Sequence, residues 1–128
     1  MKLLLDTHVL LWWWTDDPQL SAKARELIHD QANDILVSAA SAWEIATKHR
    51  LGKLPIAAAA LPRFHELIEL DGFEHLPVTY LHALRAGNFQ SGHRDPFDRM
   101  LAAQSTLEGA QLITCDPAFS SFDTTVVW

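Results

Sequence analysis

The first apolar run of the chain stops at a charged residue, and this constrains both the fold and the site. Residues 3–5 are three leucines, and Asp6 follows them directly. A short apolar run without polar alternation is typical of a strand buried on both faces, as in a parallel sheet. Ligands of open α/β sheets bind outside the carboxyl ends of the strands. Asp6 is therefore predicted to lie at the mouth of a site, either as a metal-ligating or catalytic carboxylate or as an N-cap for the next helix.

Strand patterns and helix patterns alternate along the whole chain. This alternation predicts an α/β fold, a three-layer α/β/α sandwich with a central, mostly parallel sheet. Ser21, Ser41, Thr79 and Asp95 are the predicted N-caps of four of the helices. The strands are expected at residues 3–5, 34–39, 73–78, 111–115 and 124–128, and the helices after the first tryptophan-rich segment at 22–32, 42–51, 57–70, 80–86 and 96–108.

Length and composition fit one globular domain. The chain has 128 residues, 48% of them hydrophobic, so we expect residues 1–128 to form a single domain with a real core. No apolar run approaches the roughly 20 residues of a membrane helix, and no signal-peptide pattern is present. The single cysteine, Cys115, has no internal disulfide partner. It is interpreted as a buried strand thiol, and it fits a reducing, cytoplasmic location.

The net charge of −6 limits the ways in which the chain could meet a nucleic acid. A passive nucleic-acid binder usually presents a basic face. An enzyme that contacts phosphates through metal ions is still compatible with this charge, because clustered carboxylates attract the cations that meet the phosphates.

Five carboxylates are predicted to gather at one edge of the sheet. The carboxyl ends of parallel strands and the starts of the following helices share that edge, and the chain places acids at both kinds of position. Such a cluster is strongly repulsive unless cations neutralise it, and oxygen ligands without Cys or paired His favour Mg²⁺ or Mn²⁺. The five residues are Asp6, Glu44, Asp95, Asp98 and Asp116.

Helix capping is the competing interpretation for each of these acids. Ser41 and Glu44 have the spacing of a capping box, and Asp95 precedes Pro96 as an N-cap precedes a proline at the first helical position. Capping explains Glu44, Asp95 and Asp98 one at a time. It explains Asp6 and Asp116, which follow apolar runs, poorly.

Four motifs in order resemble a PIN-domain ribonuclease, and more narrowly the VapC-type toxins of bacterial toxin–antitoxin modules. They are Leu-Leu-Leu-Asp-Thr-His at the start, Ser-Ala-Trp-Glu-Ile at 41–45, His-Arg-Asp-Pro-Phe-Asp-Arg at 93–99 and Thr-Cys-Asp at 114–116. The resemblance spans essentially the whole chain. It implies a PIN-like α/β/α sandwich, an Mg²⁺- or Mn²⁺-dependent endoribonuclease, an antitoxin that blocks the site, and a homodimer.

The resemblance also assigns roles to individual residues. It implies that Asp6, Glu44, Asp98 and Asp116 are the catalytic metal-site acids. Asp95 is interpreted as a cap that also contacts the metal or its water. The hydroxyls of Thr7 and Thr114 are candidates to hydrogen-bond the ligating carboxylates, and Arg94, Arg99 and Lys48 are candidates to contact RNA or the antitoxin.

Two other functions compete with this one. A haloacid-dehalogenase-type phosphohydrolase also uses an aspartate after its first strand, but it needs a second Asp where this chain has His8. A catalytically inactive PIN-like binding module is the other alternative, although no acid of the motif is missing. Trp12–Trp14 are expected to be mostly core residues, with a contact to the antitoxin or a second copy as the alternative.

Overall fold

The computed structural model describes residues 1–128, and its centre is a five-stranded sheet in which every pairing is parallel. The strand order is β3-β2-β1-β4-β5. The strands are β1 (Lys2–Leu5), β2 (Asp34–Ser38), β3 (Glu74–Leu76), β4 (Gln111–Ile113) and β5 (Val126–Val127). The predicted three-layer sandwich with a mostly parallel sheet is confirmed, and the sheet is parallel throughout.

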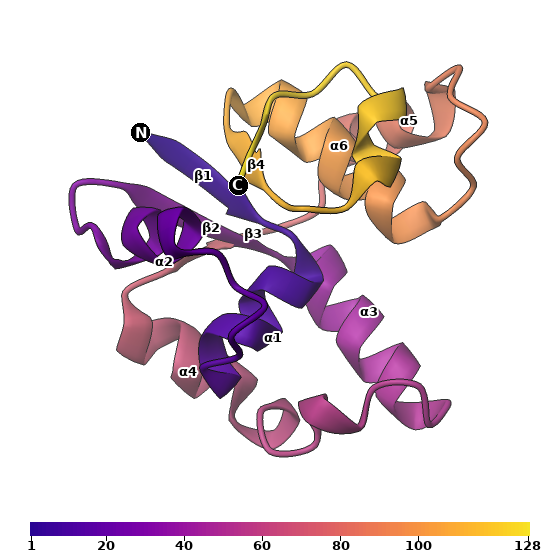
Figure 1. Ribbon diagram of the computed structural model, residues 1–128. Coiled ribbons are helices and arrows are strands. Elements are labelled where there is room, and N and C mark those ends of the chain that lie inside the picture. The colour runs from indigo at the N-terminus through magenta and orange to yellow at the C-terminus, as the bar shows by residue number, and fades with distance from the viewer.

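Helices cover both faces of the sheet (Figure 1). Leu3 and Leu5 of β1 belong to one core cluster and Leu4 to the other, as expected for a strand buried on both faces. In Figure 1, α5 and α6 lie on one side of the sheet, and α1, α2 and α4 lie on the other. The helices are α1 (Thr7–Thr15), α2 (Ala22–His29), α3 (Ala39–Arg50), α4 (Phe64–Asp71), α5 (Tyr80–Asn88) and α6 (Pro96–Glu108), with 3-10 turns at Pro55–Ala57, Leu61–Arg63 and Pro117–Ser121.

The strand order places a topological switch point beside β1. The chain continues from β1 to β2 on one side, and β4 lies on the other side. Crevices that bind ligands form at such points, at the carboxyl ends of the strands. Asp6, which follows β1, and Thr114, which follows β4, therefore sit where this architecture places a site.

The start of α3 differs from the prediction. Ser38, not Ser41, is the N-cap, and its hydroxyl accepts the N–H of Ala40. The helix begins at Ala39, so β2 passes into it without a loop. Glu44 is therefore the sixth helical residue, and the predicted capping box of Ser41 and Glu44 is wrong.

The segment predicted as one helix at 57–70 is another correction. It contains the last residue of the Pro55–Ala57 turn and all of the Leu61–Arg63 turn, and α4 starts only at Phe64. Pro62 explains the break, because proline lacks an N–H and disfavours the α conformation of the residue before it. Smaller differences are that α2 ends at His29 and that Cys115 is exposed, beyond the end of β4, rather than buried in a strand.

The three tryptophans of α1 are all half-buried and pack against the larger core cluster. The indole N–H groups of Trp13 and Trp14 donate to the same oxygen of Asp71, at 3.2 and 2.9 Å. Trp12 stacks edge-on against Trp128 near the C-terminus. No helix combines the length and apolar character that crossing a membrane requires.

Candidate active site

Asp6 is a buried carboxylate at the end of the central strand. Its side chain is not a helix cap, although the residue occupies the N-cap position of α1. Instead, Oδ2 accepts a 2.7 Å hydrogen bond from the hydroxyl of Thr114. The same hydroxyl accepts the N–H of Asp116 at 3.0 Å. Thr114 thus fixes Asp6 across the switch point between β1 and β4.

Glu44 is a second buried carboxylate, with 3% of the residue exposed. It pairs through Oε2 with the ammonium of Lys48 one turn later on α3. Its other oxygen, Oε1, is buried and has no hydrogen-bond partner. A buried carboxylate oxygen without a hydrogen-bond partner destabilises the fold, and a bound ligand would satisfy it.

Asp98 lies in the first turn of α6 and is held by His93. The imidazole Nε2 lies 2.8 Å from Oδ2 of Asp98, and because a carboxylate only accepts, the imidazole is the donor. Asp95 is the predicted N-cap: its Oδ1 accepts the N–H groups of Phe97 and Asp98, at 2.9 and 3.2 Å. Pro96 occupies the first helical position, as expected.

The three carboxylates act on one another electrostatically. Burial, together with the charges of Asp98 and Glu44, raises the pKa of Asp6 to about 7, and the Thr114 hydrogen bond opposes this rise. Burial also raises the pKa of Asp98, which the His93 hydrogen bond opposes and the charges of Asp95 and Glu44 reinforce. The fold therefore brings Asp6, Glu44 and Asp98 together from β1, α3 and α6.

Lys48 is the cation nearest to this group. Partial burial works against its charged form, but the hydrogen bond and charge of Glu44, together with Asp95 and Asp98, raise the pKa of Lys48. A single ammonium offsets only part of the negative charge of three neighbouring acids.

The donor set fits a hard divalent cation. It consists of carboxylate oxygens, the ligands that Mg²⁺ and Mn²⁺ prefer, and one of them is the unpartnered Oε1 of Glu44. The ligand oxygens of Asp6, Glu44 and Asp98 are not all within 4.8 Å of one another. Two adjacent cations, or one cation that draws the side chains inward, would match this wider spacing.

Asp116 and the two predicted arginines differ in exposure and in hydrogen bonding. Asp116 is exposed and caps the Pro117–Ser121 turn, where its Oδ1 accepts the N–H of Ala118.

Arg94, which directly precedes Asp95, is exposed. The guanidinium of Arg99 donates to five backbone carbonyls, those of Ala86, Gly87, Phe89, Ser91 and His93. Arg99 therefore anchors the 86–93 segment and has no N–H left for RNA or a partner.

The two threonines also have different partners. Thr114 binds Asp6 directly, whereas the hydroxyl of Thr7 donates to the hydroxyl of Ser41, at 3.0 Å. Only the backbone N–H of Thr7 acts on the Asp6 carboxylate, whose pKa it lowers.

Comparison with known families decides the classification. The family described as the PIN domain matches residues 3–124. The chain belongs to the PIN-domain family. Ribonuclease VapC22 of Mycobacterium tuberculosis is 30% identical over 115 residues, which cover 89% of this chain and 86% of the relative. Ribonuclease VapC16 of the same organism is 41% identical over 69 residues, and that match covers only 51% of this chain and 49% of the relative.

Solved structures share the fold of this PIN domain at low sequence identity. VapBC2 from Rickettsia felis, crystallised with a DNA fragment from the promoter, matches with a TM-score of 0.71 at 15% identity and covers 100% of this chain and 98% of that one. FitAcB from Neisseria gonorrhoeae matches with a TM-score of 0.66 at 24% identity, over 98% of this chain and 96% of that one.

The sequence did not lead us to expect an aromatic pair beside the acids, one member of which is exposed. Trp43, which precedes Glu44, is 61% exposed. Its ring meets that of Phe97, which precedes Asp98, edge-on at 4.7 Å between centroids. Both aromatic residues are sequence neighbours of candidate metal-site acids, and this adjacency was the available signal. Stacking of unpaired bases on aromatic rings is a common mode of single-stranded RNA recognition.

Proposed function

We propose that this PIN domain is a metal-dependent ribonuclease of the VapC type, the toxin of a toxin–antitoxin module. Membership of the PIN family and the similarity to two relatives named as VapC ribonucleases support this function. The observation that carries it is Oε1 of Glu44, a buried carboxylate oxygen without a partner beside two further buried or half-buried acids. The salt bridge to Lys48 involves only Oε2 of Glu44 and therefore leaves Oε1 free to bind a cation.

In this proposal Asp6, Glu44 and Asp98 hold Mg²⁺ or Mn²⁺. The bound cation would supply an activated water and stabilise the leaving oxygen of a phosphodiester. Thr114 keeps Asp6 pointed into the site, and the His93 imidazole fixes Asp98. Lys48 holds the other oxygen of Glu44 and leaves Oε1 available as a ligand.

The remaining predicted acids have outer roles. Asp116 is proposed as the outermost acid, tied to the site because its N–H donates to the Thr114 hydroxyl that binds Asp6. Asp95 is proposed as the cap of α6 through Oδ1, which accepts two backbone N–H groups of that helix, while its other oxygen can contact the metal or its water.

RNA is proposed to lie across the exposed rim of the site. Arg94 offers a cation for phosphates, and Trp43 offers an exposed ring for an unstacked base. The antitoxin is proposed to cover the same rim, where it would block access to the acids. A homodimer is also proposed, and the exposed apolar side chains of Tyr80, Leu81 and Leu84 on α5 support a further contact surface.

The test is cleavage of RNA by the purified chain in Mg²⁺ or Mn²⁺, in EDTA, and by matched variants. Asp6→Asn and Glu44→Gln should each abolish cutting. Asp34→Asn is the matched control because Asp34 is an exposed acid that begins β2, at the opposite end of the sheet. Activity lost in EDTA and in the site variants but kept in Asp34→Asn is the expected result.

Other outcomes would point to different functions. Equal cutting by Asp6→Asn would reject the site and indicate a contaminating nuclease. If no RNA is cut and Mn²⁺ binds neither the wild type nor Asp6→Asn, the chain is an inactive binding module, whereas Mn²⁺ bound by the wild type alone would indicate a nuclease selective for another RNA. Phosphate trapped covalently on Asp6 would instead indicate a phosphohydrolase.

A further inference from the structure

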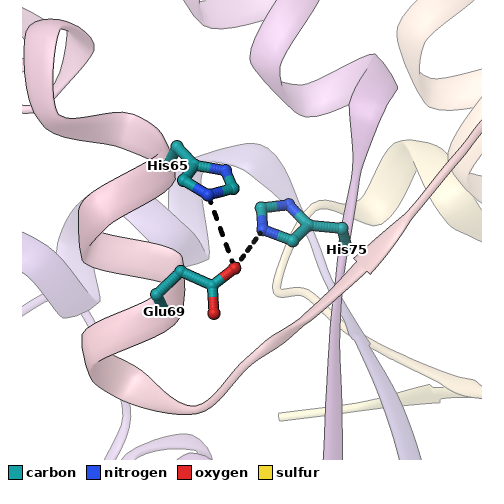
Figure 2. A group of neighbouring side chains, drawn as sticks. All are labelled: His65, Glu69 and His75. Carbon is teal, nitrogen blue, oxygen red and sulfur yellow. Dashed lines mark hydrogen bonds and ion pairs between the residues drawn. The ribbon is translucent and has the colours of Figure 1, made fainter.

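A second group of metal-ligating side chains lies away from the acids, on α4 and the edge strand β3. His65 and Glu69 are one helical turn apart on α4, and His75 is the middle residue of β3. Figure 2 shows both imidazoles directed toward the same carboxylate oxygen. The Nε2 atoms of His65 and His75 lie 3.6 and 3.3 Å from Oε1 of Glu69.

The spacing of the ligand atoms in this group is compatible with the shell of a tetrahedral metal ion. One ligand atom from each residue lies within 4.8 Å of the other two. Zinc binds imidazole nitrogen and carboxylate oxygen at about 2.0–2.2 Å, so neighbouring ligand atoms around it are roughly 3.3–3.5 Å apart. The two measured separations from Glu69 fall at about this spacing.

Hydrogen bonding alone accounts for the same group less well. The contact at 3.3 Å is at the long end of the range for N–H···O bonds, and the contact at 3.6 Å is beyond it. The two rings are stacked almost parallel, 11° apart with centroids at 5.0 Å. Nearly parallel ring planes do not meet at one point, so a single ion bound by both Nε2 atoms would require one imidazole to turn about its side-chain torsions, which the exposure of both residues permits.

The site is accessible and has room for another ligand. All three residues are exposed. Both histidines line a groove of about 450 Å³ between α4, β3 and the start of α3. A water molecule or a partner's side chain can enter there.

We propose that His65, Glu69 and His75 form a transition-metal site, with Zn²⁺ as its ion and a fourth position open to the groove. The ion would join α4 to the exposed edge strand of the sheet. Its nitrogen ligands distinguish it from the all-carboxylate group of Asp6, Glu44 and Asp98, which favours Mg²⁺ or Mn²⁺. The proposal is independent of the proposed ribonuclease activity.

Calorimetric titration of the full chain with Zn²⁺ tests the site. An Asp6→Asn, Asp98→Asn background removes binding at the acids. The expected result is one Zn²⁺ per chain, with affinity reduced at least about tenfold by His75→Ala and by Glu69→Gln. His29→Ala, which removes another exposed histidine, is the matched control and should bind as the background does.

A second measurement shows whether a variant still folds. The side chains of His65, Glu69 and His75 are 79%, 61% and 45% exposed, so the substitutions should leave the circular dichroism spectrum unchanged. Zn²⁺ should raise the Tm of the background and of His29→Ala, but not that of His75→Ala. Equal Zn²⁺ affinity in His75→Ala, Glu69→Gln and the background, or no binding to the background, would overturn the proposal.

Discussion

At the scale of single residues, the proposed site is built at a cost in stability. Asp6 is 7% exposed, and its neighbours Glu44 and Asp98 carry the same charge. Burial and these charges raise the pKa of Asp6 from 3.8 to about 7. Between these two pH values, Asp6 is therefore protonated in the folded chain and ionised in the unfolded chain. As pH rises through this window, the free energy of unfolding of the metal-free protein falls.

This linkage predicts that Asp6→Asn stabilises the metal-free protein at alkaline pH. Asparagine keeps the shape of the side chain without the charge. In EDTA at pH 8 the variant should be more stable than the wild type by up to about 4 kcal/mol, because each unit of pKa shift corresponds to about 1.4 kcal/mol. Near pH 4 the two proteins should be nearly equal. Urea unfolding across this pH range is the measurement.

Mg²⁺ provides the control for the Asp6 prediction. Saturating Mg²⁺ should stabilise the wild type and leave Asp6→Asn nearly unchanged, because the variant loses a ligand. A variant less stable than the wild type at pH 8 in EDTA would contradict the prediction. That result would mean that Asp6 is a structural residue, fixed by Thr114 rather than strained beside the other acids.

The residue scale also shows where the sequence was informative. Asp6 and Asp98 could be placed at the site because strand ends and helix starts share one edge of a parallel sheet. Arg99 could not be interpreted correctly, because its five acceptors are backbone carbonyls of a loop whose path the sequence does not specify. The role of His93 likewise depends on the fold of that loop, which brings its ring to Asp98.

At the scale of elements, the start of α3 decides the role of Glu44. The sequence predicted Ser41 as the cap, after a strand ending at residue 39, and this placed Glu44 at capping-box spacing. In the structure Ser38 caps the helix, and Ser41 is buried one turn inside it, where it accepts the hydroxyl of Thr7. Local spacing cannot distinguish two serines that are three residues apart, whereas the pairing of β2 through Ser38 fixes where the strand ends.

The position of the cap predicts that Ser38→Ala destabilises the chain by about 1 kcal/mol, the usual cost of losing an N-cap. Ser38→Asn should keep most of the stability, because asparagine is an equally good cap. Urea unfolding of both variants is the measurement. If Ser38→Asn were as unstable as Ser38→Ala, the loss would come from the buried strand position rather than from the cap.

At the scale of the whole molecule, the site exists only because both helical layers are in place. Glu44 comes from α3, whose Ile45 belongs to the core on one face of the sheet. Asp98 comes from α6, whose Leu101 belongs to the core on the other face. The sequence predicted the layers from the alternation of strands and helices. It did not predict the strand order, because pairing between strands distant in the chain has no local signature.

The net charge of the chain leads to a prediction about RNA binding. The chain has a net charge of −6, and Lys48, the ammonium nearest to the acids, is paired with Glu44. Because the net charge is negative and the cation beside the acids is already paired, we expect divalent cations in the site to provide most of the attraction for phosphates. In EDTA the affinity for a short single-stranded RNA should be low. Mg²⁺ should raise it at least about tenfold, as measured by fluorescence anisotropy with a gel to show that the RNA stays intact.

The Asp98→Asn variant makes this prediction sharper, because the sign of its effect should reverse with metal. In EDTA it removes a repulsive charge near the phosphates, so it should bind RNA more tightly than the wild type. In Mg²⁺ it loses a ligand, so it should bind more weakly. Asp34→Asn changes the net charge equally at the opposite end of the sheet, and it should show no such reversal. Wild-type affinity that is equal in EDTA and in Mg²⁺ would mean that RNA binds through side chains alone, away from the acids.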